Sequence, residues 1–259
     1  MDLREANFSN IRHPWELARQ AILLKLINKY IVKSDKKIKI LDVGSGDAYL
    51  ANSLAKTPST DSICCVDNEY TEELKVYIQN TYKNKKTKLH ISLEEVKTDI
   101  IDLITLLDVM EHVPDDTKFL NEILKQTYVK NNAFVLISVP AYQILFSHHD
   151  ELLKHYRRYN LKQLKETVNR SDLEFIEGGY FFSSLIIPRI INLILEKLNI
   201  KKQSENSENW SGSKIITTLI KNILLFDYKI AQIFKKFSIN VPGLSCYAIC
   251  IKRDEQNQT

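Results

Sequence analysis

Short apolar runs of strand length alternate with amphipathic segments of helical length along most of the chain. The runs are rich in Ile, Val and Leu and nearly continuous, which is typical of strands buried on both faces of a sheet. Strands are predicted at Lys37–Val43, Ser62–Val66, Leu89–Ser92, Ile101–Leu107, Ala133–Val139, Leu173–Phe181 and Cys246–Lys252. Helices are predicted at Pro14–Val32, Ala48–Lys56, Glu72–Tyr82, Asp116–Tyr128 and Leu161–Arg170. The alternation predicts an α/β protein whose seven-stranded, mostly parallel sheet is covered by helices on both faces.

The segment 183–236 departs from this alternation. Two apolar helical stretches, Ser183–Leu198 and Lys214–Phe226, flank the polar spacer Lys201–Ser213. The segment from Ser183 to Lys236 contains nine Lys and Arg residues and four Asp and Glu residues, which gives a local net charge of +5. We expect a helical insertion that either caps the edge of the sheet or makes a peripheral contact with a membrane or a lipid-linked substrate.

The pattern predicts a single domain that spans residues 1–259. A helical cap (1–35) precedes a cofactor-binding core (36–182) that includes an acceptor segment (140–160). The helical insertion (183–241) and a last strand (242–253) complete the chain.

The composition is that of an ordinary globular protein, with 44% hydrophobic and 26% charged residues among 259. The net charge of +4 is too small to favour a nucleic-acid partner, and none is expected. The cysteines Cys64, Cys65, Cys246 and Cys250 lack metal-finger spacing and lie in strand-like runs, so we expect reduced core residues. The first ten residues lack the apolar core of a signal peptide, and no apolar run reaches the ~18–20 residues of a membrane span. A cytoplasmic location is expected, with the inner face of the membrane as a variant.

A glycine turn and an acidic residue mark a binding site for a ribose-containing cofactor. LDVGSGDA (Leu41–Ala48) leads from the first strand into a helix, where glycines let the backbone approach a ligand closely. Tyr49 stands where a dinucleotide fingerprint needs its last glycine. Asp42 could hold an ammonium group, and Asp67, which ends the second strand, could accept both ribose hydroxyls. A cofactor with a ribose and a cationic amino-acid tail fits better than a dinucleotide.

These motifs resemble those of the Rossmann-like, S-adenosylmethionine-dependent methyltransferases. LDVGSGDA is similar to their first motif, VDNEY (Val66–Tyr70) to their acidic second motif, and LLDVMEHVPDD (Leu106–Asp116) to a motif of the UbiE or type 11–12 group. The resemblance implies the Rossmann-like methyltransferase fold, with the last strand antiparallel. It also implies that Asp42, Gly44, Gly46, Asp67, Asn68 and Asp108 bind S-adenosylmethionine, with S-adenosylhomocysteine as the product. The family often has glycine where Ala48 stands, and its adenine contact falls on Ser92, Leu93 or Glu94.

The segment VPAYQILFSHHDELLKHYRRYN (Val139–Asn160) concentrates His, Arg and Tyr residues after the fifth strand. It resembles a segment of a bacterial methyltransferase subgroup often associated with glycan or lipid-linked glycan biosynthesis. At this rim of the sheet it would face the cofactor, where the acceptor must enter, and histidine suits the removal of an acceptor proton. We therefore predict catalytic roles for His149, Asp150 and His155. Roles in acceptor binding or in a lid are predicted for Tyr142, Tyr156, Arg157, Arg158 and Tyr159.

Three functions remain open from the sequence. The first is methyl transfer to a small-molecule or glycan acceptor, at a hydroxyl oxygen or, second, at an amine. The second is metal-assisted O-methylation, because Asp108, Glu111 and His112 are similar to a Glu-x-x-Glu-His motif that holds a divalent ion in some related O-methyltransferases. With His149 or His155 as a further ligand, this mixed oxygen and nitrogen set would suit Mg²⁺ or Zn²⁺. The third is a module that binds S-adenosylmethionine without catalysis.

Overall fold

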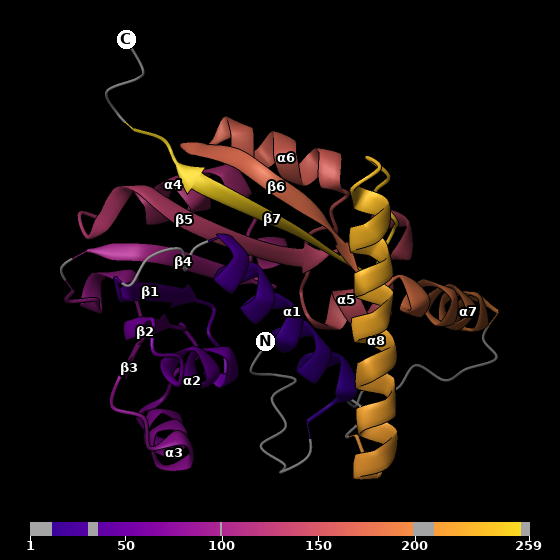
Figure 1. The fold of residues 1–259 in the computed structure, drawn as a ribbon, viewed down its shortest axis with the longest axis horizontal. Coiled ribbons are helices and arrows are strands. Elements are labelled where there is room, and N and C mark those ends of the chain that lie inside the picture. Colours follow the sequence, from indigo (N-terminus) through magenta and orange to yellow (C-terminus); the bar gives the residue numbers. More distant parts are fainter. Residues whose placement is uncertain (1–11, 31–35, 99, 199–209, 255–259) are drawn as a thin grey trace.

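The computed structural model describes residues 12–30, 36–98, 100–198 and 210–254 and contains one seven-stranded sheet (Figure 1). The strands are β1 (Ile38–Val43), β2 (Thr60–Val66), β3 (Thr87–His90), β4 (Ile101–Leu107), β5 (Val129–Pro140), β6 (Leu173–Phe181) and β7 (Ser245–Lys252). The helices are α1 (Pro14–Tyr30), α2 (Tyr49–Ala55), α3 (Glu72–Tyr82), α4 (Asp116–Leu124), α5 (His148–Leu152), α6 (Leu161–Arg170), α7 (Ile186–Lys197) and α8 (Lys214–Lys235).

The strand order is β3-β2-β1-β4-β5-β7-β6, and only β7 runs antiparallel to its neighbours β5 and β6. The predicted sheet is therefore confirmed, with its antiparallel last strand and a helical insertion, α7 and α8, before it. Chain order reverses between β1 and β4, which lie side by side. In such sheets ligands bind beyond the carboxyl ends of the strands at this reversal.

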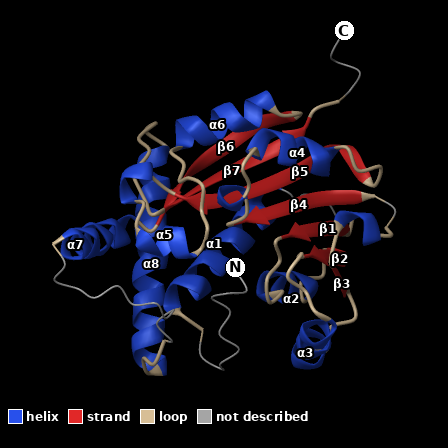
Figure 2. Cartoon of the chain, turned by 180° about the vertical axis from the view of Figure 1, so that it is seen from behind, coloured by secondary structure: helices blue, strands red, loops and turns tan. Residues whose placement is uncertain are grey.

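Helices cover both faces of the sheet because successive residues of each strand point to opposite sides. Leu41 and Val43 of β1 contribute to a core that includes residues of α4 and α6, whereas Ile38 and Ile40 contribute to a core with α1, α2 and α8. Figures 1 and 2 show these layers from opposite sides. The carboxyl ends of the parallel strands point toward α5 and α8 (Figure 1).

Three predicted elements have wrong boundaries. The helix expected to reach Tyr128 ends at Leu124, and β5 begins at Val129 rather than Ala133. Tyr128 instead donates its hydroxyl hydrogen bond to Leu93 (3.0 Å), and Asn132 takes a left-handed conformation (φ 62°) inside the long strand, which asparagine tolerates. The third strand spans Thr87–His90 rather than Leu89–Ser92.

The insertion forms two separate helices. Helix α8 packs beside α1 through buried Leu224 and Tyr228, and α7 projects away from the sheet (Figure 1). Much of the polar spacer predicted at Lys201–Ser213 lies outside the described residues. Among the helices that the structure describes, none combines the length and the apolar character that a membrane crossing requires.

Candidate active site

The glycine turn has the geometry that the sequence predicts. Gly44 and Gly46 have positive φ angles of 67° and 54°, and a Cβ on Gly44 would lie 2.4 Å from Cγ2 of Val109. Ala48 is also left-handed (φ 58°), which explains physically why a glycine suits this position. The turn therefore presents bare backbone at the carboxyl ends of β1 and β4.

Two carboxylates flank the turn. Asp42 is buried, accepts a hydrogen bond from Oγ1 of Thr105 (2.6 Å) and lines a cavity with Gly44. Burial raises the pKa of Asp42 to about 6, although the hydrogen bond from Thr105 opposes the shift. Asp67 is partly exposed and accepts the backbone N–H of Gly46 (2.9 Å), so it reaches the turn, while Asn68 beside it is exposed.

Polar residues of α1 form the opposite wall of this cavity. Glu16, Arg19 and Gln20 line it, and the first two are buried. Arg19 forms an ion pair with Asp108, whose own φ is 55°. These residues were not predicted from the sequence, although an Arg and a Glu on the apolar side of an otherwise amphipathic helix were a usable signal.

Asp150 is the centre of a buried charge cluster in the acceptor segment. Arg158 donates to both carboxylate oxygens, from Nε to Oδ1 (2.8 Å) and from Nη2 to Oδ2 (3.1 Å). Arg189 of α7 donates to Oδ2 (3.0 Å), and the Nδ1 atom of His155 lies 2.9 Å from Oδ1. Burial alone would raise the pKa of Asp150, but the hydrogen bonds and charges of His155 and Arg158 hold it well below its usual range.

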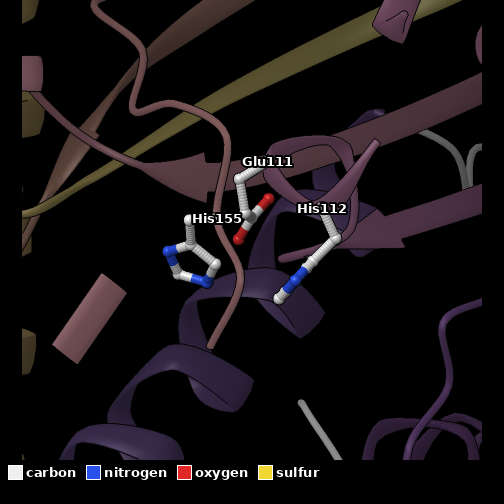
Figure 3. Close-up of side chains that lie close together, drawn as sticks. All are labelled: Glu111, His112 and His155. Atoms are coloured by element: carbon white, nitrogen blue, oxygen red, sulfur yellow. The ribbon is translucent and has the colours of Figure 1, made fainter. Parts of the chain in front are cut away.

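His155 also belongs to a second cluster. Glu111, His112 and His155 each offer one ligand atom, and these atoms lie within 4.8 Å of one another (Figure 3). Glu111 follows β4 in a short 3₁₀ turn, is fully buried, and neither of its carboxylate oxygens has a hydrogen-bond partner among the described residues. Burial raises the pKa of Glu111 to about 8, although the charges of Arg19 and Arg158 oppose the shift. Because Arg19 also lines the cavity, this cluster lies beside the predicted cofactor site.

The other predicted acceptor and lid residues occupy different environments. Tyr159 is buried and donates its hydroxyl to Asp116 (2.9 Å), while Arg157 donates to the carbonyl oxygen of Pro114 (2.5 Å). Tyr142 is half-buried and stacks on Tyr180 with ring centroids 5.2 Å apart. The side chains of His149 and Tyr156 are exposed.

Comparison with known proteins assigns the chain to a family. A family model described as a methyltransferase domain matches residues 15–177, which is more than half of the chain. The chain belongs to this methyltransferase family. The match includes the glycine turn, Asp67, Asp108 and the Glu111 cluster, whereas the helical insertion lies beyond it.

Solved structures with the same fold include other methyltransferases, all at low sequence identity. The N-methyltransferase NodS from Bradyrhizobium japonicum, in complex with S-adenosylhomocysteine, is 11% identical with a TM-score of 0.55, covering 97% of this chain and 95% of its own. Phosphoethanolamine N-methyltransferase 2 from Haemonchus contortus is 17% identical with a TM-score of 0.57, covering 95% of this chain and 55% of its own. The cyclase SpnF is 14% identical with a TM-score of 0.57, covering 95% and 85%. The comparison with curated proteins finds no match.

The cavity of this methyltransferase fits S-adenosylmethionine, its cofactor. When bound, the cofactor supplies an electrophilic methyl group on a sulfonium centre. The Gly44 backbone lines the cavity, buried Asp42 could hold the cationic amino-acid end, and Asp67, directly after β2, could hold the ribose. Arg19, once released from Asp108, would suit the carboxylate of the same amino-acid end.

Proposed function

We propose that this methyltransferase transfers the methyl group to a small-molecule or glycan acceptor, lipid-linked glycans included. A hydroxyl oxygen is the favoured acceptor atom, and an amine nitrogen is the second choice. The observation that carries the proposal is the Asp150–His155 pair at the acceptor rim. A methyl transfer to a hydroxyl needs a positioned base, because the acceptor oxygen must lose its proton as the new bond forms.

His155 supplies that base in our proposal, and Asp150 orients it. An N–H at Nδ1 donating to the Asp150 carboxylate leaves Nε2 without a proton and able to accept one from the acceptor. The ionised state of Asp150 fixes this tautomer, as its low pKa requires. Glu111, whose pKa of about 8 keeps it mostly protonated at neutral pH, can donate a hydrogen bond to the acceptor oxygen. His149 stays a candidate for acceptor contact from the exposed face of α5.

The experiment uses radiolabelled S-adenosylmethionine with extracts of small metabolites and of lipid-linked glycans. His155→Gln should lower incorporation of label by about 10²–10⁴-fold, the usual worth of a positioned acid–base group, with the affinity for S-adenosylhomocysteine unchanged. His148→Gln is the matched control and should retain most of the activity, because His148 lies in the same segment but pairs with Glu151 (3.2 Å) outside the predicted site. Equal activities of wild type and His155→Gln from pH 6 to 9 would remove the base assignment.

Metal-assisted O-methylation is a second candidate, favoured by the Glu111, His112 and His155 set. Asp108, predicted with this set, pairs with Arg19 instead, and His155 takes its place. A histidine that binds a metal usually donates the N–H of its other ring nitrogen to a carboxylate, and Asp150 is placed to accept such a bond from His155. Two imidazole ligands favour Zn²⁺ over Mg²⁺. These residues fit such an ion, which would polarise the acceptor oxygen. Loss of transfer in EDTA, restored by Zn²⁺ in wild type but not in His112→Ala, would establish this form.

A module that binds the cofactor without transferring a methyl group is the alternative from another class. The same fold occurs in the cyclase SpnF, so the fold by itself does not require methyl transfer. Binding of S-adenosylhomocysteine without incorporation of label from any extract would favour this alternative.

A further inference from the structure

The long helix α8 presents an apolar stripe to solvent along its whole length. The stripe repeats every three or four residues, the spacing of one helix face. It lies away from the residues that bury α8 against the protein, among them Leu224 and Tyr228. The exposed residues of the stripe are Ile216, Leu219, Ile223, Phe226, Ile230 and Ile233, and Phe237 continues it past the end of the helix.

Helix α7 carries a second stripe of the same kind. Ile187, Ile190, Ile191 and Ile194 are exposed, and Leu198 continues the stripe past the end of the helix. Isolated exposed apolar residues are ordinary, but two helices that each expose a continuous apolar stripe indicate an interaction surface. We call these two stripes the apolar face of α7 and α8.

Charge decides what covers this face. Four lysines along α8 and at its C-terminal cap have no ion-pair partner in the part of the chain that the structure describes. They are Lys214, Lys221, Lys229 and Lys236. Asp227, the acidic residue of α8, is already held by the N–H and hydroxyl of Ser184. A second copy of the chain would bring like charges together, which disfavours a dimer through this face. An anionic surface would neutralise them.

We propose that the apolar face of α7 and α8 docks on a bilayer of anionic phospholipid, with the helices in the plane of the interface and the lysines at the headgroups. Arg189, on another side of α7, bonds to Ser147 (2.7 Å) and Asp150, so the helix that carries part of this face also contacts the acceptor segment. The proposal is independent of which acceptor the enzyme methylates.

Sedimentation of the full chain with vesicles tests the proposal. Vesicles of phosphatidylglycerol and phosphatidylcholine should bind the protein, and vesicles of phosphatidylcholine alone should bind it far less. The double variant Lys221→Glu/Lys229→Glu should weaken binding by more than about thirty-fold. Loss of two lysines, at roughly one kcal/mol each near the surface, accounts for that factor, and the anionic headgroups repel the new carboxylates as well. Ile223→Asp should weaken it about ten-fold or more, because an apolar side chain leaves the interface.

Matched variants control for surface charge and for exposure. Val76→Asp in α3 changes a residue 53% exposed, against 50% for Ile223, and should leave binding unchanged. Lys118→Glu/Lys162→Glu makes the same change of net charge away from the face and should retain most of the binding. All variants should bind S-adenosylhomocysteine like the wild type, which separates this test from that of the methyltransferase site. No binding of wild type to anionic vesicles, equal losses in the controls, or a dimer in solution that Ile223→Asp dissociates would overturn the proposal.

Discussion

At the scale of single residues, Glu111 is the least expected group of the site. Its carboxyl is fully buried, neither oxygen has a hydrogen-bond partner among the described residues, and its pKa is raised to about 8 by burial. An uncompensated buried carboxylate is costly, so the group holds its proton at neutral pH or meets a cation or an acceptor. In either case the protonation state of Glu111 depends on what occupies the site.

The pH dependence of stability tests this state. The unfolded chain releases the Glu111 proton above its ordinary pKa of 4.5, whereas burial raises the pKa to about 8 in the folded protein. The folded protein therefore binds more protons than the unfolded chain between these values. The contribution of Glu111 to the free energy of unfolding is therefore fully present below pH 4.5. It is lost as pH rises from 4.5 to about 8, on the order of 1 kcal/mol per pH unit.

Glu111→Gln should remove this loss. Urea denaturation at pH 5, 6, 7 and 8 in EDTA should show the variant gaining on the wild type as pH rises. A difference that stays flat across these pH values would contradict the protonated, buried Glu111. Added Zn²⁺ that abolishes the slope in wild type would point to the metal-assisted form.

At the scale of elements, the acceptor segment is fixed by charges from three places in the chain. Asp150 of α5 binds Arg158 from the following loop and Arg189 from α7, and Arg158 also donates to the carbonyl oxygen of Ala141 (3.3 Å). These bonds join β5, α5 and α7 at one buried point. The cluster explains why so many titratable side chains are concentrated in one short segment.

Neighbouring arginines provide a matched test of the cluster. Arg158→Met should lower the free energy of unfolding by about 3 kcal/mol, the lower end of the range for breaking a buried ion pair, because Arg189 and His155 still compensate Asp150. Arg157→Met should lower it by less than about 1 kcal/mol, since that side chain is 31% exposed and its ion pair with Asp116 is 3.4 Å long. Urea denaturation of both variants measures the difference. Equal losses would mean that the buried pair does not hold the segment.

The hydrophobic pattern predicted the elements better than their contacts. Strands such as Ile101–Leu107 could be located because burial on both faces requires a continuous apolar run. The start of β5 could not be located, because Asn132 is typical of a turn. In the structure this residue takes a left-handed conformation within the strand. The polar clusters were beyond local patterns as well. Arg189 stands out in the sequence only as an interruption of an apolar stretch, and its partner Asp150 lies on another helix.

At the scale of the whole molecule, three layers bring the functional parts to one edge of the sheet. The glycine turn after β1, Asp67 after β2 and Glu111 after β4 follow parallel strands, whose carboxyl ends share that edge. Motif order alone predicted this part of the site. The cavity wall that α1 forms was not predicted, because Glu16 and Arg19 on its apolar side indicate a polar environment but not which part of the sheet the helix packs against.

Calorimetric titration of the wild-type chain with S-adenosylhomocysteine tests the account most directly. We expect one site with a dissociation constant in the micromolar range, on the order of −8 kcal/mol. Asp67→Ala should weaken it by about 1.5–3 kcal/mol, because charge-assisted bonds to the ribose are lost, whereas Asp61→Ala, an exposed carboxylate at the start of β2, should not change it. No detectable binding by the wild type, or equal effects of the two substitutions, would contradict the cofactor site described for this methyltransferase.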